Sequence, residues 1–323
     1  MRKAEALQTM ENIMKMQRKS KNTIKVYLEW MQKFINFLPS CKAVTHEEKV
    51  GGFLSHTVNR YNISASTQKQ ALCALVFFYK RVAKIEFGDL SFCRANRSPR
   101  LPEVFSRPEV WRVLDRLEGE GWLWAAIMYG CGLRLEETCQ LRVKDVDIDR
   151  RMVMVREGKG NKDRTVPLPE LIVEPLQKHI RNLSVLHERY AADKVPVSLP
   201  DSLDRKYPAA PYSWEWFWLF PASGPCKDPK WEGKLYHVHV STVQKRIRAA
   251  MLAAKIPKKA GCHTFRHSFA THWLENAEGS HEIAIKRLQQ LLGHKLITTT
   301  MAYLHLVQPK TDVASPLDSR VMS

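Results

Sequence analysis

The chain has 323 residues, of which 44% are hydrophobic, so it is long enough for two domains and apolar enough to bury their cores. Lys and Arg outnumber Asp and Glu by 51 to 33, which gives a formal net charge of +18. The composition excludes a solvated tail, and the charge favours a nucleic-acid partner over a basic protein indifferent to DNA, because each neutralised phosphate releases counterions.

Neither the cysteines nor the apolar segments indicate a secreted or membrane protein. The seven cysteines are odd in number and none has Cys-x-x-Cys spacing, so no disulfide framework or zinc ribbon is predicted. Residues 1–16 mix charges through a helical pattern and lack the apolar core of a signal peptide. No apolar run approaches the roughly 18 residues of a membrane span. We therefore expect a cytoplasmic protein without a membrane partner.

Residues 1–96 are predicted to form a small bundle of helices. Ser20 and Ser64 each precede apolar residues spaced by three and four, as expected at the N-termini of amphipathic helices. The two apolar stripes consist of Tyr27, Met31, Phe34 and Leu38, and of Leu72, Leu75, Val76 and Tyr79. The segment holds 16 Lys and Arg and 7 Asp and Glu, a net of +9. Single lysines commonly solvate helix faces, but this density favours a surface that follows a phosphate backbone.

A basic, proline-rich stretch at 97–105 is predicted to link this bundle to a second domain, residues 106–323. Alternation at 151–155 and 164–168 on either side of a Gly-Lys-Gly-Asn turn predicts an antiparallel hairpin. The other strongly patterned segments look helical: 122–129, 243–255, 262–275 and 283–292. The expected fold class is therefore mostly α with a small antiparallel β-sheet.

One arginine of this domain stands in a context suited to phosphate contact. Arg134 follows a glycine-punctuated helix junction, and Glu137 lies three residues later on the same helix face. The planar guanidinium matches phosphate oxygens, and the nearby carboxylate would hold it in position. The alternative is an ordinary surface ion pair.

A second arginine lies on a helix with an aromatic stripe. Phe265, Phe269 and Trp273 recur every fourth residue on one side. His263 and Arg266 are therefore expected on the other side, close together. His263 and His267 also have the spacing of a zinc pair. No glutamate follows His263 and no third ligand stands out, so no metal site is predicted.

Two further residues are ordinary when each is considered alone. Gly293 closes a predicted helix before His294, and Tyr303 follows that histidine by nine residues. Together with the preceding motifs they become specific. Arg134, Lys159 in the hairpin turn, His263-x-x-Arg266, Gly293-His294 and Tyr303, in this order and spacing, resemble the active-site positions of the tyrosine recombinase (phage integrase) family.

The resemblance implies a helical core-binding domain and a recombinase catalytic domain, which cleave and rejoin DNA by type IB topoisomerase-like chemistry. Tyr303 would be the nucleophile and would form a 3′-phosphotyrosine. Arg134 and Arg266 would clamp the phosphate oxygens.

The resemblance also implies the remaining roles. His294 would hydrogen-bond the scissile phosphate, and His263 would serve as a base for the tyrosine. Lys159 would protonate the departing 5′-oxygen, with Lys162 instead at a backbone phosphate. No cofactor or metal is implied, because the phosphotyrosine bond conserves the energy of the phosphodiester.

Residues 190–221 read as an insertion that resembles the extra module of integron integrases. Three tryptophans lie within five residues of this segment; Trp214 and Trp218 are expected in the core. By resemblance, Trp216 and His237 would bind bases extruded from folded single-stranded DNA, with His239 and Pro229 shaping the pocket.

The implied partners are hairpin (attC-type) and duplex (attI-type) DNA sites and further copies of the chain in a tetramer on DNA. Two departures from the family pattern are a long segment at 274–287 and Leu304-His-Leu in place of Thr-His-Val. Two alternatives stay open. One is a Xer-like or phage-type integrase on duplex sites, and the other is a DNA-binding relative without catalysis.

Overall fold

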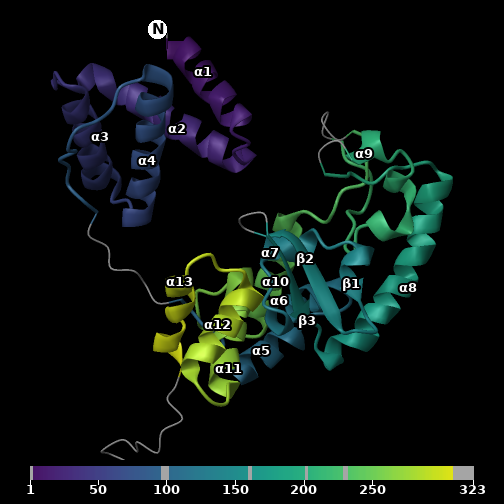
Figure 1. Ribbon diagram of the computed structural model, residues 1–323. Coiled ribbons are helices and arrows are strands. Elements are labelled where there is room, and N and C mark those ends of the chain that lie inside the picture. Colours follow the sequence, from purple (N-terminus) through teal and green to yellow (C-terminus); the bar gives the residue numbers. More distant parts are fainter. Residues whose placement is uncertain (1–2, 96–101, 159–161, 201–202, 228–231, 308–323) are drawn as a thin grey trace, which may run out of the picture. The chain divides into compact units, whose positions relative to one another are not determined.

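The computed structural model describes residues 3–95, 102–158, 162–200, 203–227 and 232–307. The chain divides into two compact units, Met1–Arg100 and Leu101–Ser323. Figure 1 shows helices in both units and a small sheet in the second. The predicted fold class, mostly α with a small antiparallel sheet, is confirmed. No helix in the described stretches is long and apolar enough to cross a membrane.

Over residues 3–95, the first unit is a bundle of four α-helices followed by a short π-helical turn, Tyr79–Ala83. The helices are α1 (Lys3–Met16), α2 (Lys21–Phe37), α3 (His46–Tyr61) and α4 (Ala65–Phe78). Both predicted caps form: Ser20 Oγ accepts the amide of Thr23, and Ser64 Oγ accepts that of Thr67. The buried core includes Met31, Phe34, Leu75 and Tyr79 from the two predicted stripes.

The second unit contains a three-stranded antiparallel sheet and several helices. Its strands are β1 (Val146–Asp147), β2 (Met152–Gly158) and β3 (Lys162–Pro167), in the order β1-β2-β3. The predicted hairpin is therefore confirmed, whereas the two residues of β1 are too short to give an alternating pattern. The helices are α5 (Arg107–Leu114), α6 (Glu120–Gly130), α7 (Leu135–Cys139), α8 (Glu170–Ala192), α9 (Leu203–Lys206), α10 (Val240–Ala253), α11 (Cys262–Asn276), α12 (His281–Leu292) and α13 (Ile297–Met301).

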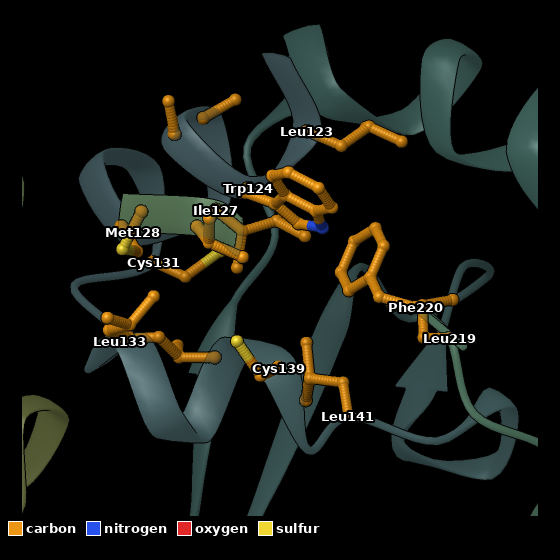
Figure 2. Packing of buried hydrophobic residues seen from close by; sticks show 14 of the residues in the cluster. Leu123, Trp124, Ile127, Met128, Cys131, Leu133, Cys139, Leu141, Leu219 and Phe220 are labelled. Atoms are coloured by element: carbon orange, nitrogen blue, oxygen red, sulfur yellow. The ribbon is translucent and has the colours of Figure 1, made fainter. Parts of the chain in front are cut away.

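Helix α6 provides the centre of the second unit's core and contacts α8, α10 and α11. Figure 2 shows the indole of Trp124 beside the ring of Phe220, with Leu133, Cys139 and Leu141 in the same cluster. The two aromatic rings meet edge to face at a centroid distance of 6.0 Å. Because Phe220 lies in the tryptophan-rich segment, part of that segment belongs to the core.

The same segment is fixed to the chain just before β1. The amide of Val143 donates to the carbonyl of Phe217, and the amide of Leu219 donates to the carbonyl of Leu141. Trp218 is buried, as predicted, while Trp214 is only half-buried and stacks on Phe217. The backbone pairing leaves Trp216 at the edge of the core.

Candidate active site

The carboxylate of Glu137, on α7, contacts three arginine side chains from different parts of the second unit. Arg134, which precedes α7, donates its amide to Oε2 at 2.8 Å and its Nη1 to Oε1 at 2.6 Å. Arg164 of β3 donates to both carboxylate oxygens, at 3.0 and 2.7 Å. Nη1 of Arg266, from α11, lies 3.6 Å from Oε2. One carboxylate therefore orients three guanidiniums, and the predicted contact between Arg134 and Glu137 is confirmed.

The charge on this cluster is positive at neutral pH. Burial alone raises the pKa of Glu137, but the hydrogen bonds and charges of Arg164 and Arg134 lower it to about 2. The carboxylate is thus ionised over the physiological range. Three guanidiniums minus one carboxylate leave an excess of two positive charges among these four groups, which suits a bound phosphate.

Arg266 is buried between the ends of two helices. Its Nη1 donates to the carbonyl of Gly132 at 2.7 Å, and its Nη2 donates to the carbonyl of Leu292 at 2.6 Å. The Leu292 carbonyl ends α12, where it has no partner within the helix and carries partial negative charge, so it holds a cation well. Burial and then the charge of Arg134 lower the pKa of Arg266. Arg266 therefore faces inward instead of standing on an exposed helix face beside His263.

His294 and Tyr303 lie next to this guanidinium. Nε2 of His294 is 3.3 Å from Nη2 of Arg266, and its Nδ1 is 2.9 Å from Oγ1 of Thr300. The His294 and Tyr303 rings are nearly parallel, with centroids 6.2 Å apart. Tyr303 is only 4% exposed and packs in a cluster formed mainly by α11 and α12.

The hydroxyl of Tyr303 is 2.9 Å from Nδ1 of His267. Burial raises the pKa of Tyr303, although Arg266 and Arg134 oppose that rise. Burial, followed by the charges of His263 and Arg266, lowers the pKa of His267 to about 4. The phenol and the imidazole are therefore both neutral at pH 7.

The second unit thus brings together four predicted site residues, Arg134, Arg266, His294 and Tyr303. His263 is exposed in the first turn of α11. Lys159 lies outside the described residues, in the connection between β2 and β3.

Two members of this cluster, Arg164 and His267, were not among the predicted site residues. Arg164 lies two residues before buried Val166 on β3, so it shares the inward face of that strand. An arginine at an inward-facing position could have identified it as a site residue from the sequence. His267 follows Arg266 directly, but its position one turn from His263 suggested only a metal pair.

The residues predicted to form the pocket for an extruded base occupy different environments. Trp216 is half-buried and lines a cavity of about 660 Å³ with Arg142, Lys144, Arg156 and Trp218. His237 is buried, packs against Trp218 at a centroid distance of 5.1 Å, and its Nδ1 donates to the carbonyl of Val238. His239 caps α10, where its Nδ1 accepts the amide of Ser241. Pro229 lies outside the described residues.

A lysine covers the ring of Trp216 in the cavity. Nζ of Lys144 is 2.8 Å from the centroid of the indole. Burial and then the charge of Arg156 lower the pKa of this lysine to about 8. Arg142, in turn, donates to the carbonyls of Trp216 and Ser198 and so holds the insertion in place.

The half-buried His267 and His294 predict a loss of stability in mild acid. Burial is the main cause that lowers the folded-state pKa of His267 and of His294 to about 4, whereas an unfolded histidine titrates near 6.5. As pH falls from about 6.5 towards 4, only the unfolded chain takes up these protons, so each histidine lowers the free energy of unfolding by about 1.4 kcal/mol per pH unit.

Chemical denaturation between about pH 7.5 and about pH 5 measures this slope. The double variant His267→Asn, His294→Asn should have a shallower slope. A residual slope is expected from His237 and His272, whose folded-state pKa values are also lowered by burial. An unchanged slope in the double variant would contradict the prediction.

Comparisons with known proteins identify the family of the chain. The model of the phage integrase family matches residues 117–309, and the model of the N-terminal SAM-like domain of phage integrases matches residues 7–89. An integrase/recombinase of Escherichia coli is 39% identical over 310 residues, which cover 93% of this chain and 89% of that protein. A tyrosine recombinase of Pseudothermotoga lettingae is 28% identical over 318 residues, which cover 94% and 95% of the two chains.

Among solved structures, the Tn1549 transposon integrase in complex with a circular intermediate DNA has the same fold. Its TM-score is 0.62 at 16% identity, and the match covers 98% of each chain. The family model, the SAM-like model and the Escherichia coli relative together span both units. The chain therefore belongs to the phage integrase family of tyrosine recombinases.

Proposed function

We propose that this protein, a site-specific tyrosine recombinase, cleaves and rejoins DNA strands through a 3′-phosphotyrosine on Tyr303. The observation that carries the proposal is the convergence of Arg134, Arg266 and His294 beside the buried phenol of Tyr303. An attacked phosphodiester gathers negative charge on its non-bridging oxygens, and preorganised donors stabilise that charge most when they need not move.

Each residue has a role that its contacts support. Arg134 and Arg266 stabilise the charged phosphorus centre, and Glu137 keeps both guanidiniums in position. His294 hydrogen-bonds a phosphate oxygen. Lys159, by resemblance, protonates the departing 5′-oxygen. The phosphotyrosine bond retains the energy of the broken phosphodiester, so the reaction requires no nucleotide and no metal.

In this proposal one domain binds DNA and the other carries out catalysis. Residues 1–96 form a core-binding domain, 97–105 a linker and 106–323 the catalytic domain. The SAM-like match at 7–89 and the net charge of +9 support a DNA-binding surface on the first of these. Four protomers assemble on two DNA sites, as the family resemblance implies.

The tryptophan-rich segment supports the finer proposal of an integron-type recombinase that acts on folded single-stranded sites. Trp216 lines a cavity that also contains Lys144 and Arg156, an aromatic face among cations. A base extruded from a hairpin would stack on this indole and displace the ammonium of Lys144, which would then meet the phosphate of the same nucleotide. His237 supports the cavity from behind, through Trp218.

Trapping of the covalent intermediate tests the catalytic proposal. A nicked suicide substrate should yield a denaturant-resistant protein–DNA adduct with the intact protein and none with Tyr303→Phe. Tyr129→Phe is the matched control, because Tyr129 also hydrogen-bonds a histidine of α11, His272, at 2.9 Å. Should the intact protein give no adduct while binding the DNA, the chain is a DNA-binding relative without catalysis.

Replacement of Trp216 tests the choice of substrate. Trp216→Ala should weaken binding of a bulged hairpin about 5- to 150-fold, the equivalent of about 1–3 kcal/mol for one stacked base. A duplex site should be bound as before. Trp214→Ala controls for damage to the segment, because that indole stacks on Phe217. Equal losses on hairpin and duplex would favour a Xer-like or phage-type enzyme for duplex sites.

A further inference from the structure

The nucleophilic hydroxyl of the proposed reaction has one specific neighbour. Oη of Tyr303 lies 2.9 Å from Nδ1 of His267, and the two ring centroids are 5.6 Å apart. Neither ring is exposed: Tyr303 is buried and His267 is half-buried. A phenol is a far stronger acid than the N–H of a neutral imidazole. The hydroxyl therefore donates, and Nδ1 accepts in the tautomer that carries its proton on Nε2.

We propose that His267 is the base that accepts the phenolic proton of Tyr303 in strand cleavage and returns it in rejoining. This inference rests on the proposed phosphotyrosine mechanism. As the bond from Tyr303 Oη to phosphorus forms and the bond from phosphorus to the 5′-oxygen breaks, the phenolic proton moves to Nδ1 of His267. The 5′-oxygen takes its proton from a separate donor, proposed above as Lys159. In rejoining, each proton and bond returns by the reverse path.

The other histidines near the site do not contact the Tyr303 hydroxyl in the way His267 does. His263, which the family resemblance suggested as the base, is exposed in the first turn of α11. His294 uses Nδ1 toward Thr300, while its Nε2 faces the guanidinium of Arg266. Among the histidines within the described residues, His267 has the hydrogen bond to Tyr303.

Bound DNA would strengthen His267 as a base. In the free protein, burial and the charges of His263 and Arg266 keep its imidazole neutral, which is the form that accepts a proton. The scissile phosphate brings negative charge into the cluster of Arg134, Arg266 and His294, and a nearby anion favours the imidazolium. The arginines at the same time favour the phenolate over the phenol. Bound DNA thus makes His267 a stronger base, while the phosphate offsets part of the effect of the arginines on the phenol.

Single-turnover cleavage of a suicide substrate tests the role. His267→Asn keeps a hydrogen-bond acceptor near the position of Nδ1 but removes the base, so cleavage should slow about 10²- to 10⁴-fold. His272→Asn is the matched control: His272 lies on the same helix as His267, and its Nδ1 is also 2.9 Å from a tyrosine hydroxyl, that of Tyr129. The control should cleave within a few-fold of the unaltered protein. Should His267→Asn not fold, His267→Gln also removes the base, with its amide near the position of Nε2 instead of Nδ1.

Two chemical changes, one in the protein and one in the DNA, show whether His267 acts as a base or only as a structural contact of Tyr303. A fluorinated tyrosine at position 303 has a more acidic phenol, so the defect of His267→Asn should shrink in that background. A 5′-bridging phosphorothiolate needs no proton on its leaving group. It should rescue Lys159→Ala and leave the defect of His267→Asn unchanged.

Three results would overturn the proposal. These are a His267→Asn protein as fast as the control, a defect of the same size with fluorinated tyrosine, and rescue of His267→Asn by the phosphorothiolate. Each of them leaves the phosphotyrosine mechanism intact. Failure of the mechanism itself would appear differently, as absence of any adduct from the protein with His267 in place.

Discussion

Replacement of Glu137 by glutamine is expected to lower the free energy of unfolding of the second unit by about 3–5 kcal/mol. The carboxylate is buried among Arg134, Arg164 and Arg266, and the side chains of the last two are 9% and 5% exposed. Glutamine is nearly isosteric but neutral, so it leaves buried guanidiniums without their counter-charge. Loss of one partner of a buried ion pair costs far more than the pair contributed, because the remaining charge stays desolvated.

The same change should abolish adduct formation, because Arg134 and Arg266 lose the group that orients them. Chemical denaturation of Glu137→Gln and of Glu170→Gln gives the comparison. Glu170 pairs with Arg151 on the surface, so its replacement should cost about 0–1 kcal/mol. Similar losses in the two variants would show that Glu137 does not hold the cluster together.

Replacement of Gly132 by alanine is expected to lower the free energy of unfolding by about 2–5 kcal/mol, the sum of backbone strain and overpacking. Gly132 has φ +65°, a conformation that an L side chain rarely adopts. An added Cβ would also come closer to Cδ1 of Phe269 than van der Waals contact allows. Since the Gly132 carbonyl accepts Nη1 of Arg266, any shift of this turn also displaces a proposed catalytic guanidinium.

Gly119→Ala separates the two contributions to that loss. Gly119 has φ +55°, but an added Cβ there would meet nothing within 4 Å. Its replacement should cost only the conformational strain, about 1–2 kcal/mol, and should leave adduct formation unchanged. If Gly119→Ala and Gly132→Ala lose the same stability, contact with Phe269 is not the cause.

Local signals were sufficient for much of the fold. The serines at 20 and 64 predict helix starts because a hydroxyl beside the first turn satisfies an amide that has no partner within the helix, and both caps form. The alternation at 151–155 and 164–168 predicts β2 and β3, because period two matches the pleat of a strand. β1 was missed, since two residues carry no period.

The site was predictable where its geometry is local. Glu137 contacts Arg134 because three residues span one helical turn. The inward orientation of Arg266 depends on carbonyls 134 and 26 residues away, those of Gly132 and Leu292, which no local pattern reveals. The pairing of His267 with Tyr303 depends in the same way on how the segment after α13 packs against α11.

The contacts of His237 also depend on residues that are distant in the sequence. The family resemblance grouped this residue with Trp216, but residues 221 and 237 form a β-bridge that seats the imidazole against Trp218 instead. The imidazole therefore contacts Trp218 and not the cavity-lining ring of Trp216.

The most direct test of the phosphotyrosine proposal is to identify the residue that carries the DNA. The adduct from a suicide substrate is digested with nuclease and trypsin, and the modified peptide is sequenced by mass spectrometry. Tryptic cleavage after Lys295 and Lys310 releases a peptide in which Tyr303 is the sole tyrosine. We predict a nucleotide joined through its 3′-phosphate to Tyr303. A nucleotide on any other residue, or a 5′-phosphate linkage, would contradict the proposed chemistry.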